Sequence, residues 1–475
     1  MSAQTAEAAT AATAARVIGT VARVIGTATR VASAIATPTV RGPSSAVAFE
    51  HRLTKLDSGV RIVTEAMPSV RSVSLGFWIG TGSRAETDAE AGLSHLLEHL
   101  LFKGTEKYAS LEIDQIFDGM GAELNAGTGK ETTSVYARVI DEHVPEALDV
   151  MTDMVFRPTL TDVDSERAVI LEEIAMYEDD PQEKVFDVLG EAVFGEHPLG
   201  RAIIGRAEVI AQTPVADIAR FHASRYVPSN IVIAAAGAVD HDSFVELVSE
   251  RTTGLSDGAV TNSDQAPPAA GARRRFERKD TEQYHVCLGG PGLSRHDERR
   301  FALRVLDTVF GGTSSSRLFQ EIRERRGLAY AVYSFSSAYQ DAGQVGLYLG
   351  TRADNLSEAM DVIGTELARV REEPATAEEL ARAKENLKGR VVLALESTGA
   401  RMNRLGSEVL AVAPLLSLDE VMERIEAVSV EDLSGLVAVL WAPERLSAAG
   451  IGPEEERFEQ ALAAIEPALV SEGAE

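Results

Sequence analysis

The run GLSHLLEHLLFKGT at residues 92–105 combines the leucine spacing of a buried helix with three side chains that can carry out chemistry. That spacing predicts a helix over 88–102. His95 and His99 lie four residues apart, so both imidazoles leave one face of this helix and can bind one metal ion. Glu98 precedes His99 and can reach a water molecule beside the metal without being a ligand itself.

A metal site on this helix needs a third protein ligand, which a second predicted helix over 162–177 can supply. Its acidic candidates are Glu166, Glu172 and Glu173. Glu166 and Glu173 are about two helical turns apart and share one face, whereas Glu172 points about 100° away from Glu173. The spacing alone leaves open which of these acids binds a metal.

Short runs rich in β-branched residues surround these helices and predict an α+β fold. Thr161 and Asp162 are expected to cap the helix that carries the acids. The expected strands are 59–66, 72–79, 121–127, 132–139 and 231–237, and further helices are expected over 110–118 and 141–154.

The second half of the chain resembles the first, which predicts a tandem duplication. VPEALDVMTDMV at 144–155 is echoed by LSEAMDVIGTEL at 356–367, and each run leads to a long helix, the second over 376–395. A stretch rich in Gly, Ser, Ala and Pro separates the halves. The predicted parts are a tail at 1–45, a metal-binding domain at 46–252, a linker at 253–275, a second domain at 276–460 and an acidic tail at 461–475.

The composition excludes several classes of protein. The 475 residues carry a formal net charge of −27, so no nucleic-acid partner is expected, because phosphate binding needs basic patches. The single cysteine, Cys287, rules out an intrachain disulfide and a cysteine-rich zinc finger. No apolar run approaches the roughly 18 residues of a membrane span.

The N-terminal segment differs from the rest in charge. It holds Arg16, Arg23, Arg30 and Arg41 against one acid, Glu7, and it repeats the motif ARVIGT. An arginine-rich, acid-poor segment is typical of a disordered tail and also of an organelle transit peptide. Both interpretations stay open, whereas a secretory signal fits poorly.

Five separated motifs follow one another along the chain: GLSHLLEHLLFKGT at 92–105, GAELNAGTGKETT at 121–133, ERAVILEEIAMYEDDP at 166–181, HPLGRAIIG at 197–205 and GGTSSSRLFQEIRERRGLAYAVYS at 311–334. In this order they resemble the pitrilysin (insulinase) family of zinc metallopeptidases, and in particular the mitochondrial processing peptidase branch and its bacterial relatives. The resemblance implies two homologous domains, each a mainly antiparallel sheet packed with helices.

The resemblance also implies the chemistry. It implies one Zn²⁺ per chain, held by His95, His99 and Glu173, with Glu98 as the general base. Glu166 matches the family's second acid, which supports catalysis without binding the metal. The second half contains no H-x-x-E-H run, so it is expected to lack a metal site.

Further residues match positions that contact substrate in the family. Glu183 and Asp187 would bind substrate arginine, and Arg323 and Tyr330 would reach the substrate from the second domain. The complete set is Phe102, Asn125, Ala126, Glu183, Asp187, Arg323 and Tyr330, with Asn125 and Ala126 on the strand that pairs with the substrate backbone and Phe102 beside the scissile bond.

The expected function is that of a zinc endopeptidase that cleaves peptides or unfolded, presequence-like polypeptides in an enclosed chamber. Family members pair into clamshells, so a homodimer is expected, with a related non-catalytic subunit as the alternative partner. Two other roles stay open: the catalytic subunit of a heteromeric processing peptidase, and a non-catalytic scaffold of the same fold. The expected location is the bacterial cytoplasm, with the mitochondrial matrix as the alternative.

Overall fold

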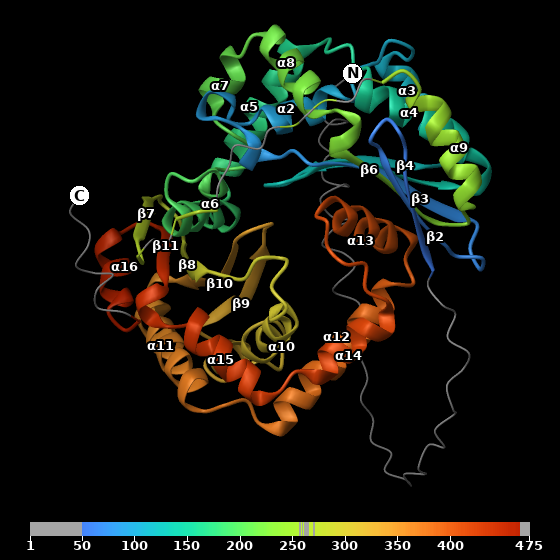
Figure 1. Cartoon of the computed structure of the whole chain (residues 1–475). Helices are drawn as coiled ribbons and strands as arrows, with labels where there is room; N and C mark the ends of the chain where they lie inside the picture. Colours follow the sequence, from blue (N-terminus) through green and yellow to red (C-terminus); the bar gives the residue numbers. More distant parts are fainter. Residues whose placement is uncertain (1–49, 256–257, 259, 261–265, 269–270, 466–475) are drawn as a thin grey trace, which may run out of the picture. The chain divides into compact units, whose positions relative to one another are not determined.

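The computed structural model describes residues 50–255, 258, 260, 266–268 and 271–465. The predicted tail at 1–45 and most of the predicted acidic tail at 461–475 lie outside these residues. The described chain forms two mixed β-sheets that are packed with helices (Figure 1). This arrangement confirms the predicted α+β class.

The first sheet contains six strands in the order β1-β2-β6-β3-β5-β4. Only β2 and β6 are parallel neighbours, and the other neighbouring pairs are antiparallel. β6 is buried along its whole length, as its apolar sequence IVIAAAG requires of a strand covered on both faces. The strands are β1 (His51–Lys55), β2 (Arg61–Ala66), β3 (Ser72–Ile79), β4 (Glu123–Thr128), β5 (Thr133–Ile140) and β6 (Ile231–Gly237).

The second sheet repeats this topology. Its order is β7-β11-β8-β10-β9, with β7 and β11 parallel, so its strands take the places of β2, β6, β3, β5 and β4 of the first sheet. The shared order confirms the predicted duplication. The strands are β7 (Arg274–Arg278), β8 (Gln283–Pro291), β9 (Ala329–Ala338), β10 (Gly343–Arg352) and β11 (Ser447–Gly452).

Each sheet has its own apolar core beneath helices of its own half. In the described part of the chain, no helix is long and apolar enough to cross a membrane. The helices of the first half are α2 (Leu93–Leu100), α3 (Ser110–Gly119), α4 (Val144–Phe156), α5 (Val163–Glu178), α6 (Pro181–Phe194), α7 (Ala207–Gln212), α8 (Val215–Arg225) and α9 (His241–Thr252). Those of the second half are α10 (Arg300–Phe310), α11 (Leu356–Glu372), α12 (Ala377–Ala394), α13 (Thr398–Leu410), α14 (Leu418–Ala427), α15 (Val430–Leu440) and α16 (Glu455–Leu462).

The two halves exchange one helix each (Figure 1). α6 follows α5 in the first half, but Val185 and Leu189 on its apolar side join a buried cluster with Cys287 of the second sheet. In return, α13 of the second half packs on β2, β3 and β6, where Leu405 contributes to a buried cluster with Trp78. Each exchanged helix covers an apolar face of the other half's sheet and so removes that face from water.

Buried polar contacts fix α13 on the first sheet. Arg401 forms an ion pair with Glu65 of β2, and both side chains are almost completely buried. The hydroxyl oxygens of Thr398 and Ser74 lie 2.9 Å apart in a hydrogen bond. Because polar groups without partners are costly to bury, these contacts define one position for α13.

The helix that carries the histidines is shorter than the predicted 88–102. Asp88–Glu90 form a separate 3₁₀ turn, and α2 covers only Leu93–Leu100. Gly92 interrupts the predicted helix because its φ of +100° is left-handed. A Cβ atom there would lie 2.9 Å from the carbonyl oxygen of Ile204, so glycine also permits a close approach of that loop.

The predicted cap of α5 is only partly observed. Asp162 occupies the position before the helix with a φ of +55°, but its side chain makes no capping bond. The hydroxyl of Thr161 donates to the carbonyl oxygen of Lys103 over 3.0 Å instead. This bond ties the start of α5 to the segment that follows α2.

Candidate active site

α2 and α5 pack against each other and bring the three predicted metal ligands together. The Nε2 atoms of His95 and His99 each lie 3.7 Å from Oε2 of Glu173. One possible ligand atom from each of these residues lies within 4.8 Å of the others. The group does not include Glu172, so the phase of α5 selects Glu173 between the two neighbouring acids.

The donor set and its spacing fit a zinc ion. Two imidazole nitrogens and one carboxylate oxygen form a recurrent catalytic zinc site, which leaves a fourth position for water. Zinc bonds of 2.0–2.1 Å in a tetrahedron separate ligand atoms by about 3.3 Å. The 3.7 Å between each histidine nitrogen and the Glu173 oxygen is close to that value, and the group as a whole, whose ligand atoms lie within 4.8 Å, is somewhat wider.

Glu166 supports this group from about two turns before Glu173 on α5. Its Oε2 lies 3.3 Å from Nδ1 of His99, and its Oε1 lies 2.9 Å from Nζ of Lys103. The side chain of Glu166 is buried. A carboxylate on the second nitrogen of a ligand histidine orients the ring and fixes its tautomer, so Glu166 can hold His99 with Nε2 toward Glu173.

His95 is held in its neutral form. Burial lowers the pKa of His95 to about 4, and the neighbouring His99 adds to the decrease. Neutral imidazole is the form that binds metals, so protons compete weakly for His95 above that pH. Its Nδ1 is buried without a hydrogen-bond partner among the described residues, which leaves Nε2 as the nitrogen that faces Glu173.

Glu98 points from α2 toward β4. There Thr128 donates its hydroxyl hydrogen to Oε2 of Glu98 in a short contact. Burial raises the pKa of Glu98, and the bond from Thr128 opposes this rise. A general base works best when its pKa lies near the working pH, so the environment of Glu98 suits proton transfer.

Thr128 is a site residue that the sequence analysis missed. It lies in the motif at 121–133, but its contact with Glu98 joins two motifs and has no local periodic signal.

Glu86 was also missed, and it caps the N-terminus of α2. Its two carboxylate oxygens accept the backbone N–H groups of Gly92, at 2.8 Å, and Ser94, at 2.7 Å. Burial raises the pKa of Glu86 to about 7, although both bonds act in the opposite direction. Because the first N–H groups of a helix have no partner inside it, Glu86 fixes the start of α2 immediately before His95.

A cavity of about 1,360 Å³ lies along β4 beside the site. Phe102, Asn125 and Thr128 contribute to its walls, and the exchanged helix α13 contributes Met402. Ala126 follows Asn125 on β4, which is the edge strand of the first sheet. An edge strand beside a cavity can pair with an extended peptide through backbone hydrogen bonds.

The remaining predicted substrate residues lie outside the lining of this cavity. Glu183 and Asp187 are one helical turn apart on α6. Burial raises the pKa of Asp187, whereas the charge of Lys130 and a hydrogen bond from Tyr177 lower it. Asp187 therefore already has a basic neighbour, and Glu183 is the more exposed of the two acids.

Arg323 and Tyr330 form a pair in the second half. The guanidinium carbon of Arg323 lies 4.3 Å from the centre of the Tyr330 ring, and Nη1 donates to the Tyr330 carbonyl oxygen over 3.0 Å. Arg323 belongs to a π-helical turn, Phe319–Glu324, a feature that is frequent at functional sites. Tyr330 is 78% exposed, so the pair presents a large aromatic surface to solvent.

Two family models match the chain. Residues 61–207 match the family described as Insulinase (Peptidase family M16), and residues 214–387 match the Peptidase M16 inactive domain. The first match contains the histidine and glutamate group and β4. The second match contains Arg323 and Tyr330.

Known proteins are similar over most of the chain. An uncharacterized zinc protease of Streptomyces coelicolor is 44% identical over 417 residues, which cover 86% of this chain and 90% of that protein. An uncharacterized zinc protease of Bacillus subtilis is 41% identical over 389 residues, 82% of this chain and 95% of that protein. The crystal structure of a protease from Helicobacter pylori has the same fold, with a TM-score of 0.81 at 22% identity over 86% of this chain and 100% of that chain. These matches confirm the resemblance seen in the sequence motifs, and the chain belongs to the insulinase family of zinc metallopeptidases, peptidase family M16.

Proposed function

We propose that the protein is a zinc-dependent endopeptidase that hydrolyses peptides and unfolded or presequence-like polypeptides. The observation that carries this proposal is the group of His95, His99 and Glu173 within 4.8 Å, with Glu98 on the same helix as the histidines. The relatives in Streptomyces and Bacillus are named zinc proteases, which supports zinc as the metal. One such group in the described residues supports one ion per chain.

The proposed mechanism divides the work between the metal and Glu98. A zinc ion in this site would polarise the scissile carbonyl group and lower the pKa of the attacking water. Glu98 accepts the proton of that water at its carboxylate and later delivers it to the leaving amine. Thr128 holds the carboxylate of Glu98 in one orientation, and Glu166 holds the ring of His99.

We place the substrate in an extended conformation along the open edge of β4. Asn125 and Ala126 would pair with its backbone, and Phe102 would contact the side chain beside the scissile bond. Glu183 and Asp187 would bind a basic substrate side chain. The net charge of −27 favours the approach of such substrates.

We further propose that two copies of the chain form a clamshell around a chamber. The exposed pair of Arg323 and Tyr330 would then contact substrate from the second half. Because one chain carries both this pair and the complete metal group, a homodimer needs no separate non-catalytic subunit. Relatives in bacteria support a bacterial origin, and we place the protein in the cytoplasm.

Neighbouring acids on α5 provide a matched test of the metal site. Glu173→Gln should reduce the zinc content from about one ion per chain to near zero, because neutral amides are poor zinc ligands. Glu172→Gln changes the adjacent, exposed acid and should keep the zinc. Equal zinc content in the two variants would refute the proposed ligand set.

A further inference from the structure

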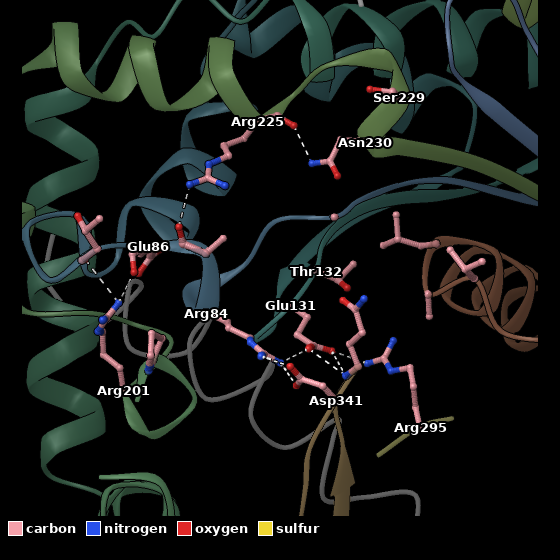
Figure 2. A pocket seen from close by; sticks show the side chains of 18 of the residues that line it. Arg84, Glu86, Glu131, Thr132, Arg201, Arg225, Ser229, Asn230, Arg295 and Asp341 are labelled. Carbon is pink, nitrogen blue, oxygen red and sulfur yellow. Dashed lines mark hydrogen bonds and ion pairs between the residues drawn. The ribbon is translucent and has the colours of Figure 1, made fainter. Parts of the chain in front are cut away.

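A cluster of four charged side chains joins the two halves of the chain (Figure 2). Glu131 lies in the turn between β4 and β5, and its Oε1 accepts a hydrogen bond from Arg84 at 2.8 Å while its Oε2 accepts one from Arg295 at 2.9 Å. Arg84 also binds Asp341, in the turn between β9 and β10, over 2.7 and 2.8 Å. The backbone N–H of Gln340 donates to both oxygens of Glu131, at 3.0 and 3.1 Å.

This cluster connects equivalent hairpins of the two sheets. β4 and β5 occupy the places in the first sheet that β9 and β10 occupy in the second. The side chains of Arg84 and Glu131 are only 9% and 15% exposed, so water screens their interaction weakly. Arg295 and Asp341 are 28% and 35% exposed, and the formal charges of the two arginines and two acids cancel, which makes a partly buried network of this kind tolerable.

The cluster also fixes the backbone of the turn that follows β4. The N–H groups of Ser83 and Arg84 donate to the carbonyl oxygens of Gly129 and Lys130 over 3.2 and 2.7 Å. Gly82 permits this approach, because a Cβ atom there would lie 2.2 Å from the carbonyl oxygen of Gly129. The turn is therefore held by backbone bonds on one side and by Glu131 on the other.

This turn begins one residue after Thr128, the residue that donates to Glu98. Arg295 and Thr132 line both the cavity beside β4 and a second cavity of about 920 Å³ around Arg84 and Asp341 (Figure 2). A displacement of the turn would therefore move both the wall of the proposed substrate cavity and the partner of Glu98.

We propose that Glu131 is a positioning residue of the peptidase reaction: through Arg84, Arg295 and the N–H of Gln340, it uses the second half of the chain to hold Thr128 against Glu98. This inference rests on the proposed function. Glu131 then affects turnover through Thr128 and not through the metal ligands.

The test is the substitution Glu131→Gln, made in the wild-type protein and in a Thr128→Val background. In the wild-type background kcat should fall about tenfold, the loss that corresponds to about 1.4 kcal/mol of transition-state stabilisation. In the Thr128→Val background the same substitution should lower kcat less than about threefold, because the group through which it acts is absent. Zinc content should be equal in all four proteins.

A matched control is the ion pair of Glu379 with Arg317. It also has two side-chain bonds, of 2.8 and 2.9 Å, and the side chains of Glu379 and Arg317 are 20% and 9% exposed. The pair lies in the second half, and neither residue lines either of the two cavities. Glu379→Gln should lower the thermal stability by an amount similar to that of Glu131→Gln and leave kcat unchanged. If Glu131→Gln does not fold, Arg295→Gln removes one donor from Glu131 and should lower kcat several-fold.

Two results would overturn the inference. One is a kcat of Glu131→Gln within twofold of the wild type. The other is the same fold-loss in both backgrounds, which would show a general structural effect. A wild-type protein without zinc-dependent cleavage would instead refute the proposed function, so the two failures are distinguishable.

Discussion

Glu86 makes the stability of the protein depend on pH in a direction that is unusual for a carboxylate. Burial raises its pKa from 4.5 to about 7, so between these values the folded chain binds a proton that the unfolded chain has released. By linkage, the unfolding free energy then falls as the pH rises through this range. The rise in pKa corresponds to about 3 kcal/mol, most of which should be lost between pH 5 and pH 8.

The substitution Glu86→Gln isolates this contribution. An amide has no charge in this range, so the variant lacks the proton uptake of Glu86. It can accept only one of the N–H groups of Gly92 and Ser94, which costs about 1 kcal/mol at every pH. The wild type should therefore exceed the variant in stability at pH 5, and this advantage should shrink by about 2–3 kcal/mol by pH 8.

Urea unfolding of both proteins at pH 5 and pH 8, in excess chelator, measures this difference without any contribution from metal binding. Glu379→Gln is the control, because hydrogen bonds from Arg317 lower the pKa of Glu379 to about 2. The stability that Glu379 contributes is complete above pH 4.5 and is lost only below it, so its difference from the wild type should be flat from pH 5 to pH 8. A constant difference for Glu86→Gln would refute the argument from burial.

Substitutions at two positions of α13, Gly406 and Arg401, test the exchange of helices. Gly406→Ala on α13 should destabilise the protein by about 1–3 kcal/mol, because the added Cβ atom would lie 2.2 Å from the indole ring of Trp78. Gly389→Ala on α12 is the control: its Cβ atom would meet open space, so this substitution should stabilise the protein by about 0.5–1 kcal/mol. Thermal unfolding checks both, and a stabilising Gly406→Ala would contradict the packing of α13 on the first sheet. Arg401→Met should cost about 3–5 kcal/mol by leaving Glu65 buried without its closest partner, and the addition of Glu65→Gln should recover much of this loss. A double variant whose loss of stability in denaturant equals the sum of the losses of Arg401→Met and Glu65→Gln would show that the pair is not coupled.

Local patterns predicted most of the individual elements. The alternating apolar run at 72–79 is β3, and the helix expected over 110–118 is α3 (Ser110–Gly119). Such elements follow from the repeat of side chains along a strand or a helix, which is a property of neighbouring residues. The start of α2 was predicted too early because the apolar repeat does not reveal the left-handed backbone of Gly92.

The exchange of α6 and α13 could not be predicted in this way. Val185 and Leu189 make α6 amphipathic, but an apolar helix face carries no information about which of two sheets it will cover. The repeated motifs predicted two similar domains, and each was expected to be built from its own consecutive elements. The contact of α13 with the first sheet depends on side chains more than 300 positions away, such as Arg401 and Glu65.

The prediction of the metal group rested on two kinds of evidence, the spacing of residues on a helix and the resemblance to a family. The spacing of His95, Glu98 and His99 follows from helical geometry alone. The choice of Glu173 over Glu172 came from the resemblance to the family, and the structure supports it because Glu173 is the acid that lies beside both histidines. Glu86 had no comparable signal, since its partners are backbone N–H groups that any sequence provides.

The central claim, zinc-dependent peptide hydrolysis with Glu98 as the general base, is tested most directly with the purified single chain. The assay is cleavage of a quenched fluorescent peptide that contains arginine, with zinc content measured on the same samples of wild type and Glu98→Gln. If this claim is correct, the wild type cleaves the peptide, Glu98→Gln loses at least about a hundredfold of that activity, and both proteins bind about one zinc ion per chain. Full activity of Glu98→Gln, or a wild type that binds no metal, would contradict it.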